Sequence, residues 1–402
     1  MSLPAATHVA ALACCLGTFA CAAQPGPEGG PTADTTRGIT VVCSDYVSTA
    51  VALVDPRAEM LTWSNLIHSG SRVPSVHTAL SGDVGLPTQA PISGAVLLID
   101  RYPNAVLTWV DPVSGEVLQQ LNVGMGFSAN PRDVLVFEDG AMAVTRYNAN
   151  PMPQGAGDFD LGDDVLLLDA DGTPVDALAT AEAELNGRPD RLLAVGDEIW
   201  VSLNRASNDF STYAEGMILR LRRDDAGALE RVGEIRLIGL KNCAGLKHTP
   251  LGVVVSCTGS YTLAGDIYVR SESALVGLDD AGEERWRLSA TDGRVGQCFG
   301  PELTHDQDGG VVALLYGEDA SLPDAVIRYE PETDTVSKLY TAAAPWTLSA
   351  LTTADDGVVV VGDGDPEDPR ICRLTTPISC LAACQATGLP PRVLGGYGPK
   401  PR

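Results

Sequence analysis

The sequence lacks most of the signatures on which an enzyme assignment can rest. It has no Gly-x-Ser-x-Gly elbow, no phosphate-binding glycine loop and no dinucleotide fingerprint. It has only 5 histidines. Four of them lie beyond the leader, namely His68, His77, His248 and His305. No two of these four have the spacing of metal ligands. Nucleophilic catalysis therefore finds little support in the sequence.

Basic residues are also scarce. There are 27 lysines and arginines against 52 aspartates and glutamates, which gives a formal net charge of −25. A surface of this sign repels nucleic acid and anionic lipid headgroups and favours solubility. No stretch after residue 24 is apolar for long enough to form a membrane helix. We therefore expect no nucleic-acid partner, and contact with a membrane only through a lipid anchor.

What the sequence does contain is one hairpin pattern that recurs seven times. In each copy an apolar strand runs into a turn rich in Asp, Pro or Gly, and a second strand follows. The intervals between successive turns range from 45 to 60 residues, and the turns centre near Asp55, Asp111, Asp171, Asp225, Asp280, Pro331 and Thr376. Several short strands in each repeat of this length predict an all-β fold, a seven-bladed β-propeller.

The predicted propeller spans residues 38–389. Six blades have enough strand-like segments for a four-stranded meander, at 76–124, 133–180, 191–240, 242–291, 302–343 and 347–387. Blade one begins at Ile39–Tyr46 and lacks an inner strand of its own. We expect the tail, residues 390–402, to supply that strand through Arg392–Tyr397, because a closed ring leaves no strand edge unpaired.

The first 37 residues read as a targeting segment. Residues 1–23 resemble a signal peptide, and residues 24–37 form a tether rich in Pro, Gly and Thr. Two processing routes compete, namely cleavage near Ala20-Cys21-Ala22 and lipidation of Cys21. The sequence therefore predicts an exported chain, either a cell-envelope lipoprotein or a freely secreted protein.

Seven cysteines follow the leader, and strand register suggests two disulfides. A symmetric three-residue turn would place Cys243 opposite Cys257, within disulfide reach. The same arithmetic pairs Cys372 with Cys380, and Cys384 is the rival partner. The chain has no Cys-x-x-Cys, so metal binding is the weaker reading of these cysteines in an exported protein.

Loop lengths predict which face of the ring binds other molecules. Turns between the first and second strands of each blade are tight, whereas loops between the second and third strands are long, as at 148–162, 204–215 and 258–273. Function tends to lie on irregular loops that a rigid scaffold holds in place. We therefore expect the working surface on this long-loop face.

The connections into the inner strands reach the channel mouth on the same face and are polar. Two of them read Asn-Pro-Arg-Asp and Arg-Pro-Asp-Arg. The candidate ligand-binding ring comprises Asn130, Asp133, Arg188, Asp190, Asn242 and Glu302. Its carboxylate and amide oxygens suit Ca²⁺, whereas its mixture of Arg and Asp suits a small polar ligand. The structural alternative is a set of turns in which each acid accepts backbone N–H groups.

A second candidate Ca²⁺ site is the acidic loop at residues 158–164. Its ligands would be Asp158, Asp160 and Asp163. The loop lacks the bidentate Glu that an EF-hand requires, so a solvated acidic turn is the alternative.

Polar-aromatic triplets recur where the second strands of blades one to three meet the long-loop face. They are Ser44–Tyr46, Asp100–Tyr102 and Thr145–Tyr147. These triplets, which include Asp100, Arg101 and Arg146, could form a platform for a carbohydrate or a peptide, since Tyr and Arg are frequent at binding hot spots. Packing of Tyr against Arg between adjacent blades is the plainer alternative.

The blade pattern resembles two groups of propellers. Leu278–Trp286 is similar to the Trp-bearing turn of quinoprotein-like propellers, but it occurs once and implies no quinone cofactor. Ala95–Asn104, Asn130–Asp133 and Ala143–Tyr147 resemble uncharacterised exported propellers of the YVTN-repeat type, over roughly residues 38–385. That resemblance implies a surface or periplasmic lipoprotein whose ligand is unknown.

Two functional hypotheses follow. The first is an exported, monomeric scaffold that binds a protein partner or a small polar ligand on the long-loop face. The second is a divalent-cation-dependent hydrolase or lyase, similar to a lactonase, that uses the carboxylates of the channel mouth. The second requires Asp133, Asp190 and Glu302 to approach one point, within about 2.3–2.6 Å of an ion.

Overall fold

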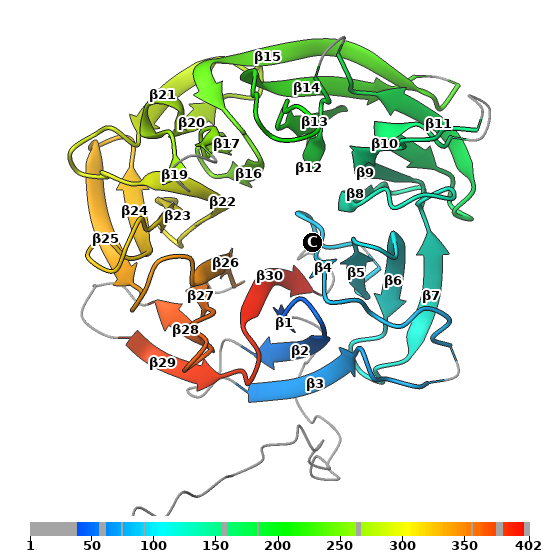
Figure 1. The fold of residues 1–402 in the computed structure, drawn as a ribbon, viewed down its shortest axis with the longest axis horizontal. Coiled ribbons are helices and arrows are strands. Elements are labelled where there is room, and N and C mark those ends of the chain that lie inside the picture. The colour runs from blue at the N-terminus through cyan, green and yellow to red at the C-terminus, as the bar shows by residue number, and fades with distance from the viewer. Residues whose placement is uncertain are drawn as a thin grey trace, which may run out of the picture. The chain divides into compact units, whose positions relative to one another are not determined.

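Seven four-stranded antiparallel sheets surround a central channel (Figure 1). This computed structural model describes residues 38–55, 62–73, 75–91, 93–154, 159–182, 185–224, 226–262, 267–354, 357–374 and 381–397. The seven-bladed propeller that the hairpin repeat predicts is thereby confirmed. The predicted signal peptide, tether and lipidation residue Cys21 lie outside the described residues, as does Asp158. Within the described part of the chain, no helix is long and apolar enough to cross a membrane.

The first four blades begin with their inner strand and end with their outer strand. Blade one consists of β30 (Pro391–Tyr397), β1 (Gly38–Ser44), β2 (Thr49–Asp55) and β3 (Thr62–His68). Blade two consists of β4 (Val84–Gly85), β5 (Val96–Asp100), β6 (Val106–Val110) and β7 (Val117–Asn122). Blade three consists of β8 (Pro131–Val136), β9 (Met142–Ala149), β10 (Gly162–Leu168) and β11 (Pro174–Ala179). Blade four consists of β12 (Pro189–Val195), β13 (Glu198–Leu203), β14 (Glu215–Arg223) and β15 (Leu229–Lys241).

The remaining blades follow the same order. Blade five consists of β16 (Gly245–Thr249), β17 (Gly252–Cys257), β20 (Ala274–Leu278) and β21 (Glu284–Ser289), with a small hairpin of β18 (Tyr261–Thr262) and β19 (Ile267–Tyr268) and a 3₁₀ turn, η1 (Arg270–Glu272). Blade six consists of β22 (Cys298–His305), β23 (Val311–Tyr316), β24 (Ala325–Glu330) and β25 (Thr335–Thr341). Blade seven consists of β26 (Leu348–Thr353), β27 (Val359–Asp363), β28 (Arg370–Leu374) and β29 (Leu381–Ala386).

The tail provides the inner strand of blade one. Strand β30 pairs antiparallel with β1, with Ile39 opposite Gly396 and Val42 opposite Val393. Blade one is therefore built from both ends of the described chain, and the pairing joins the two ends of the ring (Figure 1).

Apolar packing between neighbouring blades forms the core. The central strands are buried on both faces, as in β5 and β10, whereas outer strands such as β7 are mostly exposed or half-buried. Trp200 of blade four is fully buried in one cluster with Leu246 and Val255 of blade five. Each such side chain stabilises the fold by about 1.5–3 kcal/mol, so the blades are held together mainly by their shared apolar faces.

The disulfide between Cys243 and Cys257 is confirmed, although the register behind the prediction is wrong by one residue. The turn contains two residues, because Thr249 pairs with Gly252. That register would place Cys257 opposite Ala244 rather than Cys243. Asn242, next to Cys243, has a left-handed backbone (φ 52°), and β16 begins only at Gly245. Cys243 therefore lies outside the regular strand pairing where it joins Cys257.

The other cysteines have mixed outcomes. Backbone register places Cys372, which is disulfide-bonded, opposite Cys384 of β29. The predicted partner Cys380 lies outside the described residues. Cys43 and Cys298 are buried free thiols, and burial raises the pKa of Cys43 to about 12, so this thiol is a poor nucleophile at neutral pH.

A segment of blade two crosses the channel. Strand β4 has only two residues, and the chain then runs inward as Leu86–Ala90 before it returns to β5. The Thr88 N–H donates to Asp133 Oδ1 in blade three (2.8 Å), and Lys247 Nζ of blade five donates to the Thr88 carbonyl (3.4 Å). Gln89 Oε1 accepts the Ala194 N–H of blade four (3.2 Å). This channel segment therefore ties four blades together, and sequence reasoning does not find it.

Candidate functional site

A cavity of about 570 Å³ occupies the long-loop end of the channel. The start of the channel segment, Gly85 and Leu86, contributes to its lining, and so do residues of several blades. Six of the 10 tyrosines of the chain line it, together with four arginines. A volume of this size matches sites for small organic ligands.

Bulges in the inner strands direct charged side chains into this cavity. The ladder register shifts between Pro131 and Val134 in β8, and between Pro189 and Leu192 in β12. Proline has no N–H to give to a ladder, and a bulge turns the neighbouring side chains out of simple alternation. Of the residues at these two bulges, Arg132, Asp190 and Arg191 line the cavity.

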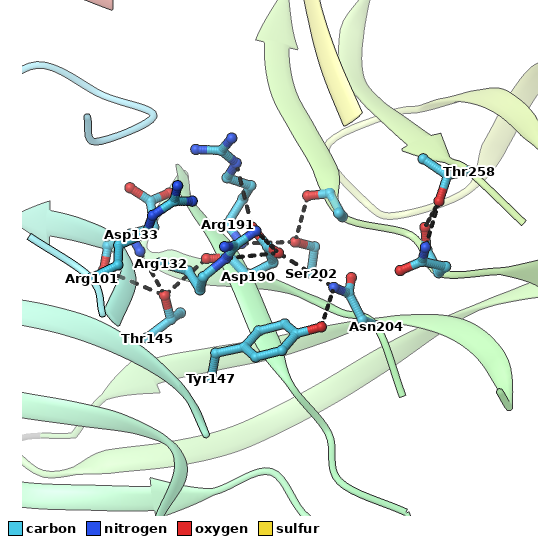
Figure 2. A network of polar contacts seen from close by, with 12 residues as sticks. Arg101, Arg132, Asp133, Thr145, Tyr147, Asp190, Arg191, Ser202, Asn204 and Thr258 are labelled. Carbon is cyan, nitrogen blue, oxygen red and sulfur yellow. Dashed lines mark hydrogen bonds and ion pairs between the residues drawn. The ribbon is translucent and has the colours of Figure 1, made fainter. Parts of the chain in front are cut away.

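Asp190 is the centre of a polar network at the cavity wall (Figure 2). Its Oδ2 accepts hydrogen bonds from Arg132 Nε and Nη2 and from Asn204 Nδ2, all at 3.3 Å. Asn204 Nδ2 also lies 3.2 Å from the Tyr147 hydroxyl. The Tyr147 ring lies between the guanidinium groups of Arg132 and Arg188, with centroid distances of 5.2 and 5.0 Å.

Two further ion pairs extend this wall. Arg191 Nη2 lies 2.6 Å from Glu302 Oε1, and Arg101 pairs with Asp83. Burial opposes the charge of Arg191, but Glu302, Asp190 and Asp133 together raise its pKa. For Arg101, burial and the nearby positive charges of Arg132 and Arg191 lower the pKa despite the pair with Asp83.

Blades five and six supply an aromatic wall. Tyr268 stacks on Tyr316 with ring centroids 5.7 Å apart, and Tyr261 meets Tyr268 edge-on at 5.3 Å. The ring of Trp346 lies 5.3 Å from Tyr316. Burial, followed by the neighbouring tyrosines, raises the pKa of Tyr268 to about 12, so its phenol is neutral and able to donate a hydrogen bond at physiological pH.

The cavity collects four of the nine predicted ligand-binding residues. Asp190, Asn242, Glu302 and Arg101 line it. Asn242 Nδ2 donates to Thr258 Oγ1 (2.6 Å), and both side chains face the same space.

The other members of the predicted ring serve the scaffold. Asp133 is fully buried and accepts the backbone N–H groups of Thr88, Val134 and Leu192. Arg188 donates to the carbonyls of the 206–208 loop and packs 4.1 Å from the centroid of the Phe210 ring. Asn130 lies, with Arg188, beside a separate surface depression. The hydrogen bonds of Asp133 are those of the structural alternative, in which the acid accepts backbone N–H groups.

Two residues of the platform predicted from the triplets do not line the cavity. Arg146 is fully buried and pairs with Asp164 inside blade three, through Nε to Oδ1 at 2.7 Å. Asp100 is buried and accepts from Ser81 and Asn104. Of the residues in the triplets, Ser44, Tyr46, Arg101 and Tyr147 line the cavity.

The acidic loop is organised by protein donors. Asp163 of blade three accepts hydrogen bonds from the N–H groups of Gly187 and Arg188. These bonds connect blade three to the start of blade four. Asp160 accepts the Gln154 N–H at 2.6 Å. Across the described residues, no group of three His, Cys, Asp or Glu side chains is placed to hold a metal ion. The three carboxylates of the cation-dependent hypothesis do not converge as free ligands, since Asp133 serves backbone N–H groups and the other two pair with arginine.

Sequence reasoning misses most of the residues that line the cavity. Arg132 and Arg191 belong to the same two sequence motifs as the predicted residues Asp133 and Arg188. The bulges in β8 and β12 change which side chains of these motifs face the channel. Arg392 arrives from the tail and packs 4.8 Å from the centroid of the Tyr46 ring. The sequence does not reveal the aromatic wall, because Tyr316 of blade six meets Tyr268 of blade five only in the fold.

Comparison with known proteins adds the fold alone. No protein-family model matches the chain, and no curated protein matches it either. A protein from Lactobacillus plantarum is similar in structure over 90% of this chain and 99% of its own, with TM-score 0.57 and 12% identity. A provisionally named 6-phosphogluconolactonase from Bacteroides uniformis covers the same shares with TM-score 0.56 and 14% identity.

An inactive variant of virginiamycin B lyase from Staphylococcus aureus, solved with quinupristin, covers 77% of this chain and 85% of its own, with TM-score 0.50 and 12% identity. At such identities these proteins share an architecture that hosts many functions. Function must therefore be argued from the cavity itself.

Proposed function

We propose that this chain is an exported propeller scaffold that binds a small polar ligand in the long-loop cavity. The observation that carries the proposal is the convergence of Arg101, Arg132, Arg191 and Arg392 with six tyrosines around about 570 Å³. Tyr and Arg are the residues most enriched at binding hot spots. They gather here in a protein whose overall charge is strongly negative.

Docking of a protein partner on the same face is the second candidate. Large apolar side chains are exposed on the loops around the cavity, with Val47 84% and Tyr46 65% exposed. Phe210, Met152 and Trp346 are exposed on other loops of this face. Scattered apolar residues need no explanation, but their presence beside the cavity mouth fits a partner that reaches over the rim.

The cation-dependent hydrolase or lyase has weaker support. Asp190 accepts from Arg132 and Asn204, and Glu302 accepts from Arg191. A metal would have to displace these partners to obtain oxygen ligands.

A thermal-shift screen of small polar compounds tests ligand binding. A ligand of the cavity stabilises the folded chain by mass action, so it should raise the Tm of the wild type and lose that effect in Tyr268→Ala. The matched control is Tyr329→Ala, which removes a ring that packs on Trp286 outside the cavity. A ligand that stabilises both variants equally binds elsewhere.

Export needs a separate test. Cell fractionation should place the wild type outside the cytoplasm, and Cys21→Ser should release it from the membrane fraction if lipidation is the anchor. Recovery of the wild type in the cytoplasm would contradict the proposal.

A further inference from the structure

Hydrogen-bond donors outnumber acceptors on the charged wall of the cavity. Four guanidinium groups bring roughly twenty N–H donors, whereas the four carboxylates of Asp83, Asp190, Asp209 and Glu302 offer about sixteen lone-pair sites. Asp190 already accepts from Arg132 and Asn204, and Glu302 from Arg191. A ligand that supplies oxygen acceptors would therefore find donors to satisfy.

Arg101 shows this surplus most clearly. Its Nε is buried and has no hydrogen-bond partner among the described residues. Like charges on Arg132 and Arg191 add to the burial that lowers its pKa. A negative group placed between these arginines would give Arg101 an acceptor and offset the repulsion between the positive charges. A carboxylate suits this position, since planar guanidinium groups bind it through two parallel hydrogen bonds.

A second buried atom without a hydrogen-bond partner in the described ranges is an acceptor, the Oδ1 of Asn204. Asn204 is 5% exposed and lines the cavity, and its Oδ1 has no partner in the described part of the chain. The orientation of the amide is fixed, because Nδ2 must face the carboxylate of Asp190. The free Oδ1 requires a donor such as a hydroxyl. The Asn242–Thr258 pair offers further amide and hydroxyl groups to the same space.

The aromatic wall faces the charged wall across the channel. Arg101 and Arg132 come from blades two and three, whereas Tyr268 and Tyr316 come from blades five and six, on the other side of the ring (Figure 1). The stacked tyrosines present a flat, partly apolar surface. A ligand that touches both walls needs an anionic edge and a flat ring face.

We propose that the cavity binds an acidic saccharide unit, a hydroxylated ring that carries one carboxylate. Its carboxylate lies against Arg101 and Arg132, its hydroxyls meet Asn204 and the Asn242–Thr258 pair, and its ring packs on Tyr268 and Tyr316. This inference rests on the proposed function and adds the chemical class of the ligand.

Ligand-observed NMR and calorimetry with D-glucuronate and D-glucose test it. The two probes share the ring and differ in the carboxylate. We expect glucuronate to bind at least about tenfold more tightly than glucose, since a charged hydrogen-bonded group discriminates strongly. Arg101→Met and Arg132→Met should each remove most of that preference. Arg223→Met is the matched control, because it removes a guanidinium paired with Asp139 on the other face and should leave the preference intact.

The outcomes separate this inference from the proposed function. Equal affinity for glucose and glucuronate overturns the requirement for an anion but leaves a small-ligand site. Acetate or inorganic phosphate binding as tightly as glucuronate overturns the saccharide. Failure of both sugars to bind, with another polar compound stabilising the wild type but not Tyr268→Ala, overturns the inference alone. Failure of every compound overturns both.

Discussion

The network around Asp190 allows a quantitative test of the site's architecture. Asp190 is 2% exposed, and Arg132 Nε and Nη2 both lie 3.3 Å from its Oδ2. A hydrogen bond to a charged group is worth about 1.5–3 kcal/mol, and loss of one partner from a buried ion pair costs about 3–5 kcal/mol. The Arg132 side chain is 28% exposed, so water in the cavity screens part of the interaction.

We therefore expect Asp190→Asn to lower the free energy of unfolding by about 2 kcal/mol, because it also weakens the contacts with Arg191 and Asn204. Arg132→Met should lower it by about 1 kcal/mol. The double variant should lose less than the sum of the two, with a coupling energy of about 1 kcal/mol.

Urea unfolding followed by tryptophan fluorescence measures these differences at a common m-value. Asp197→Asn is the matched control, since Asp197 pairs with Arg222 at 3.0 Å on the surface and its loss should change the free energy of unfolding by less than about 0.5 kcal/mol. If the effects of Asp190→Asn and Arg132→Met add to within about 0.5 kcal/mol, the two side chains do not interact and the network is wrong.

Three further predictions concern stability, pH and metal. Replacing both Cys243 and Cys257 by Ser should lower the free energy of unfolding by about 3 kcal/mol, since the bond closes a loop of sequence separation 14; a reductant should destabilise the wild type in urea more than the variant, which keeps the disulfide of Cys372. Hydrogen bonds from Arg294 lower the pKa of Asp292 from 3.8 to about 2, so its stabilising contribution is complete above pH 3.8 and is lost as the pH falls towards 2; Asp292→Asn should flatten the acid limb of stability against pH, and an unchanged limb would contradict the assignment. Titration with Ca²⁺ should give no more calorimetric heat with the wild type than with Asp190→Ala, because Asp190 and Glu302 are paired with arginine; a heat that disappears in the variant would revive the cation-dependent enzyme.

The sequence predicts the ring well and the site only in part, for different physical reasons. A repeating hairpin is a local pattern, so seven blades can be recognised without knowledge of contacts between them. The direction of a side chain at the channel depends on the bulges in β8 and β12. The register shift there brings Arg132 and Arg191 to the cavity wall, whereas Asp133 is fully buried and Arg188 lies outside the cavity lining.

Contacts between distant residues account for the rest. Arg392 enters from the tail, and the aromatic wall forms only when Tyr268 and Tyr316 meet from separate blades. The channel segment had one local sign, the two prolines in the run from Leu86 to Pro91. A pair of prolines signals a turn or an extended segment, and cannot by itself reveal a crossing of the channel.

The pairing of β1 with β30 has a consequence for biogenesis. Among the described strands, β1 comes first in the chain and finds its inner neighbour only in β30, which comes last, as Ile39 opposite Gly396 shows. Contacts this far apart in sequence form late and slow folding. Until then β1 presents an open edge that other chains could join. A chain that ends before Pro391 would have six complete blades and a first blade without its inner strand, so the open edge of β1 distinguishes unfinished molecules from finished ones.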